Sequence, residues 1–353
     1  VDGPAMLELE PSGGMVTLDV AADFVVGSGG EGTVRLADAA GASVVYGGAG
    51  EESLVIGGGA DGTLEVLQGC LSSADDVSSV VLGRDAGATG TVRINGPSSD
   101  APCDGTWTHT GVDFTVGLNG HGVIEVLGGA RLETNTDNTI TLAQTPGSSA
   151  DVLVSGAGSV WDASGSIIQT GEGESMLTVE DGGTISGIGV TNAARSTIRG
   201  DGTISSSVLP VGVSNLGTVS PSPDSGAATL TIEGRYSQID DPADPRLSGR
   251  VLMDLFDAGG GAVAADRLVV TGSAELSGSL LVRGGSGLDP NEGARVDLIT
   301  AGSPIGESRF DVAFLPGLPG GKFLRPVYDD PALPGGAQAR GAGSVSLVVD
   351  LFD

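Results

Sequence analysis

The chain has 353 residues, of which 62 are glycine and 17 are proline, and its net charge is −29 at pH 7. Hydrophobic residues make up 39%, too many for a disordered chain despite the charge imbalance. The glycines lack the three-residue period of collagen, and no apolar run approaches the roughly 18 residues of a membrane helix. So acidic a surface repels phosphates, which argues against nucleic acid as a partner. The composition therefore indicates an acidic, glycine-rich β protein.

One sequence template recurs through the first half: a β-branched pair ending in glycine, a glycine-rich turn, then Gly-Thr and an alternating strand. The clear copies are 24–27 (FVVG) with 32–36 (GTVRL), 54–57 (LVIG) with 62–66 (GTLEV), 80–83 (VVLG) with 90–94 (GTVRI), and 114–117 (FTVG) with 122–126 (GVIEV). Weaker copies follow at 140–142 with 152–154 and at 167–168 with 177–179. The alternating strands start at residues 34, 64, 92, 124, 152 and 177, which are 30, 28, 32, 28 and 25 residues apart.

This spacing predicts a stack of similar coils. Within a copy, Leu64 and Val66 point to one face while Glu65 points to the other. A unit this small cannot bury its apolar side alone, so the units must stack. We therefore predict an all-β parallel β-helix (β-solenoid) with glycines at its corners. A β-sandwich is the alternative, but it needs Asn-Gly or Asp-Gly turns that are scarce here. The predicted core positions are Leu64, Val66, Val92, Ile94, Ile124 and Val126.

The repeat decays after 200–204, and a Pro- and Ser-bearing stretch at 219–225 marks a change of organisation. We predict repetitive coils over 1–218 and a C-terminal β block over 219–353. A proline-rich segment, 315–334, is expected to be an exposed loop. The strands expected in the block are 228–233, 251–256, 267–271, 279–282, 295–300 and 345–351.

The C-terminal block contains a series of motifs in a fixed order. The series is 217–221 (GTVSP), 229–238 (TLTIEGRYSQ), 265–280 (ADRLVVTGSAELSGSL), 296–301 (VDLITA) and 305–310 (IGESRF). It resembles the closing segment of bacterial autotransporter passengers, and the glycine-rich repeats resemble those of the same surface proteins. The resemblance implies a right-handed parallel β-helix on the cell surface. Such passengers precede a membrane barrel, and this sequence stops at Asp353, so we expect a released passenger or a protein exported by another route.

The two cysteines, Cys70 and Cys103, are predicted to form a disulfide. Neither has a second cysteine or a histidine at metal-ligand spacing, which argues against zinc. The sequence starts at Val1 without a leader segment, which fits either a removed signal peptide or a protein never exported. Together with the resemblance, this leads us to expect an extracellular or cell-surface location with the signal peptide removed.

Dense acidic pairs are the candidates for catalysis, because β-helix lyases and hydrolases need clustered carboxylates with a basic residue. With 45 acidic residues, however, adjacent pairs arise by chance. Trp107 and Trp161 stand alone rather than forming a sugar-stacking platform, and no nucleophile motif accompanies the histidines. We therefore predict no catalytic residue and no enzymatic activity. The candidates weighed are Asp75 and Asp76, Asp240 and Asp241 with Asp244 and Arg246, and His109 and His121 near Asp104 and Asp113.

Two glycine-rich segments, 47–52 (GGAGEE) and 57–62 (GGGADG), partly match the nonapeptide of calcium-binding β-rolls. The full pattern and the nine-residue tandem spacing are missing, so turns are the better interpretation. We predict no cofactor, and keep Ca²⁺ at Glu51, Glu52 and Asp61 as the alternative.

The segments 253–257 (MDLFD) and 349–353 (VDLFD) are nearly identical. They either pair within one sheet or place the last strand at a sheet edge, where it pairs within the molecule or on a neighbour. Val349, Leu351 and Phe352 are therefore the candidate assembly-edge residues.

The leading functional hypothesis is a secreted or cell-surface structural or adhesive protein without catalysis. Open solenoid ends allow head-to-tail pairing, so a self-assembling extracellular fibre or matrix subunit belongs to this hypothesis. The expected partners are other copies, a host or biofilm surface, or a glycan. The alternatives are a polysaccharide-active β-helix lyase or hydrolase and a non-catalytic glycan- or receptor-binding module.

Overall fold

The computed structural model consists of strands and turns. The chain divides into two compact units, Val1–Ser196 (unit 1) and Thr197–Asp353 (unit 2). Within the described ranges, no helix is long and apolar enough to cross a membrane. The described residues are 5–9, 15–18, 24–36, 43–46, 53–67, 69–73, 79–96, 105–136, 139–206, 208, 212–221, 226–241, 243–244, 247–285, 287–305, 307–329 and 342–351.

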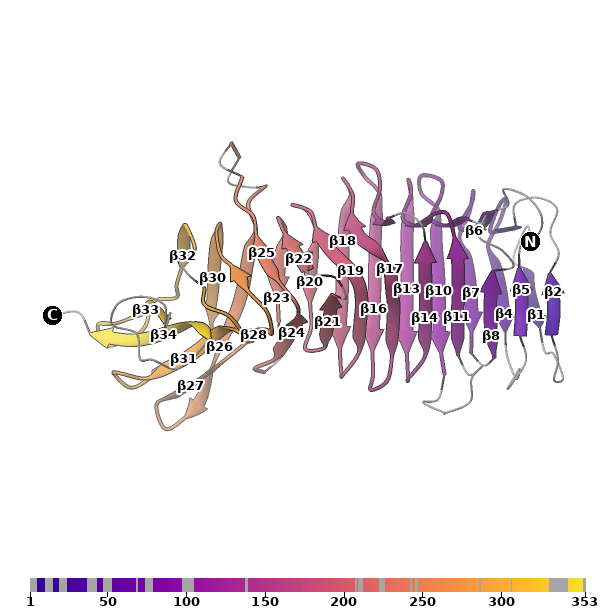
Figure 1. Ribbon diagram of the computed structural model, residues 1–353. Coiled ribbons are helices and arrows are strands. Elements are labelled where there is room, and N and C mark those ends of the chain that lie inside the picture. The colour runs from indigo at the N-terminus through magenta and orange to yellow at the C-terminus, as the bar shows by residue number, and fades with distance from the viewer. Residues whose placement is uncertain are drawn as a thin grey trace. The chain divides into compact units, whose positions relative to one another are not determined.

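Unit 1 is a parallel β-helix in which each turn of the chain adds a strand to each of three ladders (Figure 1). Ladder A contains β1 (Ala5–Leu9), β4 (Gly32–Leu36), β7 (Gly62–Val66), β10 (Thr89–Asn95), β13 (His121–Leu127), β16 (Ser149–Ser155) and β18 (Glu174–Glu180). Ladder B contains β2 (Met15–Leu18), β5 (Ser43–Tyr46), β8 (Cys70–Ser73), β11 (Thr106–Gly111), β14 (Arg131–Thr136) and the first parts of β17 (Val160–Thr170) and β19 (Thr184–Asn192). Ladder C contains β3 (Phe24–Val26), β6 (Ser53–Ile56), β9 (Ser79–Leu82), β12 (Phe114–Val116), β15 (Ile140–Leu142) and the last parts of β17 and β19.

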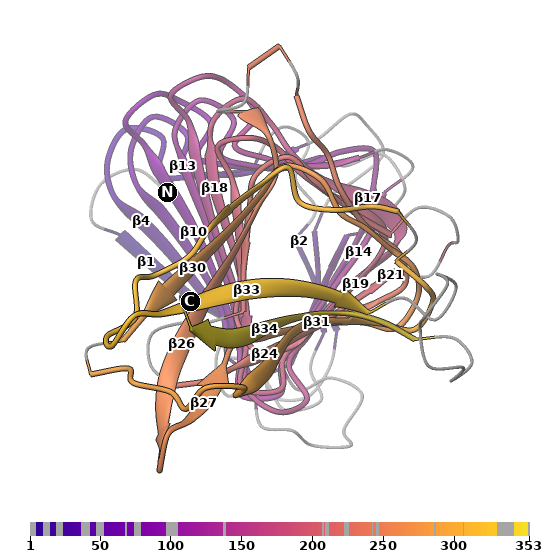
Figure 2. The ribbon, with the colours of Figure 1, turned by 90° about the vertical axis from the view of Figure 1, so that its left-hand side faces the viewer.

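All pairings within these three ladders are parallel, as Figure 2 shows with β4, β10 and β13 on one side of the interior and β14 and β19 on the other. The predicted parallel β-helix is confirmed. The β-sandwich is excluded, because its hairpins would make successive strands antiparallel.

The sequence repeat predicts the register of ladder A. The six strand positions that define the repeat are direct register partners and are all buried, so they form one column in the core. Each such aliphatic side chain contributes about 1.5–3 kcal/mol on burial. The column is Val34, Leu64, Val92, Ile124, Val152 and Leu177.

The corners between ladders C and A require glycine. Gly57 has a φ of +75°, and a Cβ atom there would lie 2.5 Å from the carbonyl oxygen of Thr89 in the next coil. Gly83 repeats the arrangement one coil later, with a φ of +60° and the carbonyl oxygen of His121 at 2.3 Å. Because both the backbone angle and the space exclude a side chain, glycine sets how closely the coils stack.

Ladder B is the part of unit 1 that the sequence template misses. Its inward positions are partly polar: His109, Thr134 and Thr136 are buried alongside Trp107. The sequence of these strands therefore shows no regular alternation of apolar and polar residues, although their side chains point inward and outward in turn, as in the other ladders.

The strands of unit 2 also form three ladders. Ladder D contains β20 (Thr197–Arg199), β23 (Thr218–Ser220), β26 (Arg250–Gly259), β30 (Ser279–Gly284) and β32 (Val312–Phe314), with β27 (Ala262–Ala265) antiparallel to β26. Ladder E contains β21 (Thr203–Ser206), β24 (Thr229–Glu233), β28 (Arg267–Val270), β31 (Arg295–Ala301), β34 (Gly343–Leu351) and β33 (Lys322–Asp329). Ladder F contains β22 (Gly212–Asn215), β25 (Tyr236–Gln238) and β29 (Ala274–Glu275).

The unit boundary differs from the predicted one. It lies between Ser196 and Thr197, rather than after residue 218. Residues 197–218 share ladders with the strands that follow them, since β20 pairs with β23 and β21 pairs with β24.

The proline-rich segment 315–334 is not a loop throughout. Residues Lys322–Asp329 form β33, and Leu324 in this strand is buried. Among the described strands β33 pairs only with β34, so it is an edge strand, where Pro326 is tolerated because a missing N–H removes no central ladder bond.

The last strand is not an open edge. β34 pairs antiparallel with β31 on one side and with β33 on the other. Val349 is buried between them and Leu351 pairs with Lys322, whereas Phe352 lies outside the described residues. Of the two expected alternatives, the described residues show pairing within the molecule, because both neighbours of β34 belong to this chain.

The motif at 229–238 has a structural explanation. The buried Tyr236 hydroxyl donates to Gln238 Oε1 at 3.0 Å and accepts from Asn215 Nδ2 at 3.2 Å. Gln238 Nε2 then donates to the carbonyl oxygen of Gly249 at 2.9 Å. These side chains link neighbouring coils of ladder F inside the unit, where an unpaired polar group is costly.

We predict that Gly57→Ala destabilises unit 1 by several kcal/mol, because it adds a backbone clash to the strain of a positive φ. The matched control is Gly87→Ala, since Gly87 has a φ of +84° but open space around its Cβ position. It should lose only about 1–2 kcal/mol. Thermal melts followed by circular dichroism measure both, and equal losses would contradict the assigned role of the corner.

We predict that Gln238→Ala costs about 2–4 kcal/mol of unfolding free energy, because it removes the acceptor of the buried Tyr236 O–H and one hydrogen bond to the carbonyl oxygen of Gly249. Ser237→Ala is the control, since the Ser237 side chain points outward to Glu275 at 3.4 Å. Urea unfolding of both variants checks this, and a Gln238→Ala variant as stable as the control would disprove the role of the network.

Candidate functional site

The outer surface of ladder A carries a row of charges of alternating sign. Parallel stacking places the same position of successive strands about 4.8 Å apart. The central outward residues of β4, β7, β10 and β13 are Arg35, Glu65, Arg93 and Glu125, which are register partners. We call these four residues the Arg–Glu row. Each charge within it lies beside a charge of opposite sign, which favours this register over a shifted one.

The Arg–Glu row is held by short contacts. Arg35 Nε donates to Glu65 Oε2 at 2.7 Å, and Arg93 Nη1 donates to Glu65 Oε1 at 3.4 Å. Arg93 Nε donates to Glu125 Oε2 at 2.5 Å. Glu65 is the most covered member, with 12% of its side chain exposed. The hydrogen bond from Glu125 raises the pKa of Arg93, so this guanidinium remains charged.

A shallow groove of about 440 Å³ runs along the Arg–Glu row. Its lining carries two glutamates and two arginines, so their charges cancel, whereas the whole chain carries −29. The groove therefore combines fixed hydrogen-bond donors and acceptors without a net charge. It is lined by Met6, Glu31, Thr33, Arg35, Thr63, Glu65 and Arg93.

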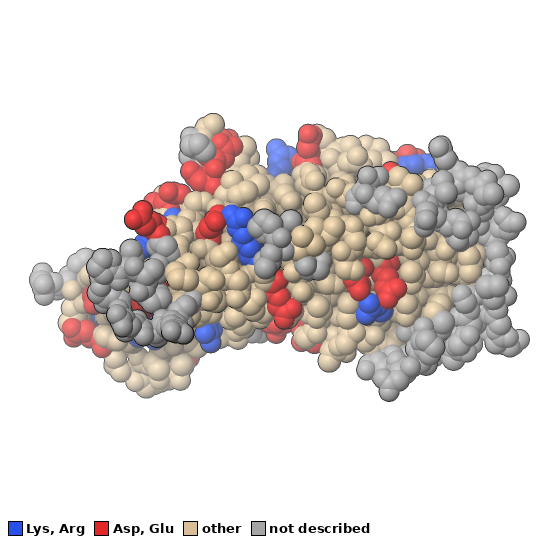
Figure 3. Space-filling model, viewed as in Figure 1, with Lys and Arg blue, Asp and Glu red and all other residues tan. Residues whose placement is uncertain are grey.

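A second charged group lies on the outer surface of ladder B. Arg131 pairs with Glu133 and, at 2.6 Å, with Asp162. Figure 3 shows acidic and basic side chains in small separate groups on the face that it displays. Burial would raise the pKa of Asp162, but hydrogen bonds from Ser164 and Ser186 and the charge of Arg131 lower it overall. A glycosidase acid needs a raised pKa, so Asp162 fits a fixed ion pair better than an acid catalyst.

A buried carboxyl with a raised pKa lies in unit 2. Asp266 is fully buried, and burial raises its pKa to about 6. Its two oxygens accept hydrogen bonds from the backbone nitrogens of Ala228 at 3.1 Å and Asp254 at 2.9 Å. Because both oxygens face the backbone rather than solvent, this carboxyl connects strands and cannot reach a substrate.

The two histidines do not share a site. His109 is buried inside unit 1, where its Nδ1 lies 2.9 Å from the hydroxyl of Tyr46. His121 lies on the outer surface of ladder A, with Nδ1 at 2.7 Å from Ser149 Oγ and Nε2 at 3.6 Å from Asp151 Oδ2. The sequence analysis did not predict that Ser149 and Asp151 contact His121. The 28-residue coil spacing was the available signal, since Ser149 is the register partner of His121.

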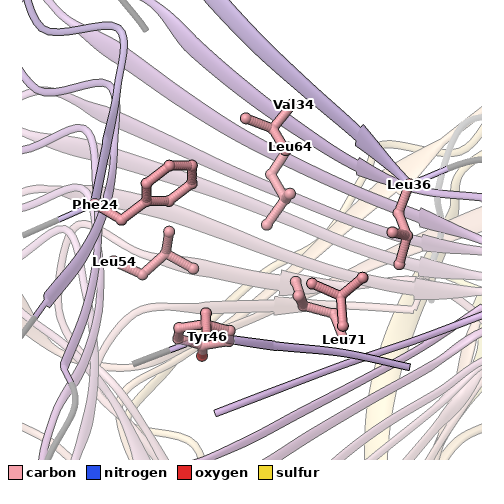
Figure 4. Close-up of a pocket in the computed structure, with 8 residues that line it drawn as sticks. Phe24, Val34, Leu36, Tyr46, Leu54, Leu64 and Leu71 are labelled. Atoms are coloured by element: carbon pink, nitrogen blue, oxygen red, sulfur yellow. The ribbon is translucent and has the colours of Figure 1, made fainter. Parts of the chain in front are cut away.

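The cavity in the core of unit 1 is a packing gap rather than a binding site. Figure 4 shows Phe24, Leu54, Leu64 and Tyr46 around it, and its volume is about 20 Å³. Its other lining residues are aliphatic, and a space this small with so few polar partners does not hold an ordered ligand.

Of the three proposed calcium ligands, Asp61 is the one that lies within the described residues. Asp61 Oδ1 accepts a hydrogen bond from the backbone nitrogen of Thr89 at 2.7 Å, which fixes the start of the next coil. Glu51 and Glu52 lie outside the described residues. Within the described ranges, no three His, Cys, Asp or Glu side chains are grouped to hold a metal ion.

The acidic pair in unit 2 shapes a loop. Ser248 Oγ donates to Asp240 Oδ1 at 2.6 Å, and Asp241 Oδ1 accepts from the backbone nitrogens of Ala243 at 2.9 Å and Asp244 at 3.2 Å. Through these hydrogen bonds the two carboxylates stabilise the turn. Asp75, Asp76, Asp104 and Arg246 lie outside the described residues.

The remaining predicted residues have structural positions. Trp107 and Trp161 are fully buried and cannot serve as platforms for a sugar. Cys70 is disulfide-bonded, and the chain's other cysteine, Cys103, lies outside the described residues. Asp113 accepts from the backbone nitrogen of Val80 through its carbonyl oxygen at 3.0 Å.

No protein-family model matches the chain, and no curated protein is significantly similar to it. The arrangement described above is therefore the basis for assigning a function.

We predict that His109 makes unit 1 less stable in acid. Burial lowers its pKa to about 4 from 6.5, so the unfolded chain binds the proton first. The stabilisation is complete above pH 6.5 and is lost as the pH falls towards 4, by about 3 kcal/mol in all. Asp266 acts with the opposite sign, because its raised pKa makes its contribution disappear as the pH rises from about 4 through 6.

The comparison of wild type with His109→Gln therefore isolates the histidine, since the Asp266 contribution is common to both. We expect the difference in unfolding free energy between the two proteins, from urea titrations, to be smaller at pH 4.5 than at pH 7.5. A difference that does not change with pH would show that His109 is not the titrating group.

Proposed function

We propose that this protein is a secreted or cell-surface structural and adhesive protein, with no catalytic role. The observation that carries the proposal is the register of unit 1, in which outward side chains of successive coils form rows at the strand spacing. The Arg–Glu row presents arginine and glutamate in alternation, so its chemistry repeats every second coil, which suits attachment to an extended or repetitive surface.

Two further observations support the proposal, one on location and one on solubility. The bonded state of Cys70 fits an oxidising compartment, because disulfides rarely persist in the cytosol. The charge of −29, with most of the described arginines in ion pairs, fits a surface that stays soluble while exposing a large area of sheet.

The last strands of unit 2 bear on whether the protein assembles into a fibre. Both sides of β34 are already paired, and the outer strand β33 carries Pro326 and the ion pair from Arg325 to Asp350 at 2.6 Å. Charged side chains and proline on an edge strand oppose pairing with another molecule. The proposal is therefore an adhesive scaffold that does not polymerise through this strand.

Immunogold labelling of intact producing cells and blotting of their culture medium test the location. We expect the protein on the cell surface or in the medium, accessible to added protease, and beads coated with it should adhere to the producing cells or their matrix. Retention in the cytosol together with no bead adhesion would overturn the proposal. Negative-stain electron microscopy of the purified chain should show separate particles.

A further inference from the structure

The groove along the Arg–Glu row has the geometry of a site for a long, narrow ligand. Its lining comes from four successive strands of ladder A: β1, β4, β7 and β10, with Glu31 just before β4. Four strands at about 4.8 Å spacing extend over roughly 14 Å, so a ligand following the groove crosses the strands. A volume of about 440 Å³ falls within the range of small-ligand sites.

The polar groups in the groove are complementary to hydroxyl groups. Arg35 and Arg93 are donors only, Glu65 is an acceptor only, and the hydroxyls of Thr33 and Thr63 serve as both. The ion pairs engage two of the three nitrogens of each guanidinium, so each arginine retains N–H groups for a ligand. Because the ion pairs hold these side chains in place, little ordering accompanies binding.

The net charges of the chain and of the groove lining favour an uncharged ligand over a polyanion or a polycation. A protein with a net charge of −29 would repel a polyanion. A polycation would bind to the acidic surface in general, and the two arginines of the groove would not favour it. The groove lining is neutral overall, which suits an uncharged ligand. Met6, 60% exposed at one end of the groove, offers an apolar surface to the C–H face of a sugar ring.

We propose that this groove binds a linear, neutral polysaccharide lying across β1, β4, β7 and β10. Arg35 and Arg93 donate hydrogen bonds to its hydroxyl groups, Glu65 accepts from them, and the repeat of the strands is matched by the repeat of the sugar units. This inference rests on the proposed function, since it names the ligand through which the protein adheres.

The test is isothermal titration calorimetry of the full chain with oligosaccharides of two to six units from three series: β-1,4-linked glucan, β-1,3-linked glucan and α-1,4-linked glucan. We expect one series to bind, with affinity rising from two to about four units and then levelling, because the groove crosses four strands. Raising NaCl from about 50 to 500 mM should change the affinity by less than about twofold, since no net charge is involved.

Arg93→Ala should weaken binding by about tenfold or more, because it removes hydrogen bonds from a charged donor. The matched control is Arg131→Ala, since Arg131 has the same exposure and also pairs with two carboxylates, but on ladder B. Thr63→Val, which removes a hydroxyl and keeps the shape, should weaken binding less than Arg93→Ala. Thermal melts verify that all three variants are folded.

Absence of binding by all three series would overturn this inference, as would equal losses for Arg93→Ala and Arg131→Ala, or binding that disappears in salt. Its failure is distinguishable from that of the proposed function. If wild-type beads adhere to cells and Arg93→Ala beads adhere equally well, the protein is adhesive through another surface. If wild-type beads do not adhere but the oligosaccharide binds, the groove is a glycan site in a protein with a different role.

Discussion

In-register parallel pairing is the constraint on which unit 1 depends. Each coil hydrogen-bonds to the next with equivalent positions facing each other, so every position belongs to a row that runs along the stack. Inward, this gives a continuous aliphatic column from Val34 to Leu177. At the corners, it brings the backbone of one coil so close to the next that Gly57 and Gly83 cannot carry side chains. A single geometric rule therefore explains both the core and much of the glycine content.

The same pairing organises the outer surface. A row of like charges at this spacing would repel, and the chain avoids this by alternating Arg35, Glu65, Arg93 and Glu125. Isolated surface ion pairs contribute little to stability, typically about 0–1 kcal/mol each. Their effect here is to fix the positions of donors and acceptors, which leaves a neutral, ordered groove on a strongly acidic protein. The proposed role in attachment follows from that order rather than from any single reactive residue.

The last strands of unit 2 pair differently from the strands of unit 1. Ladder E of unit 2 closes with the antiparallel strands β34 and β33, which replace the parallel pairing of the earlier strands. Inside the unit, Asn215, Tyr236 and Gln238 join coils through hydrogen bonds where unit 1 relies more on aliphatic packing. Asp266 performs a similar task with its carboxylate. The hydrogen bonds of Tyr236, Gln238 and Asp266 thus give the motifs at 229–238 and 265–280 a structural role, and these motifs give no direct information on a ligand.

The sequence by itself determined the parallel β-helix, the coil length and the register of ladder A, because alternating aliphatic residues and corner glycines are local signals that repeat. It also located six of the fifteen described strands of unit 2, namely β24, β26, β28, β30, β31 and β34. Only the tertiary structure decided the rest. Ladder B was hidden because its buried side chains, such as His109 and Thr134, are polar and make hydrogen bonds to residues distant in sequence. The groove, the contact of His121 with Ser149 and the pairing of β34 on both sides depend on which strands become neighbours, and that is fixed by stacking rather than by any local pattern.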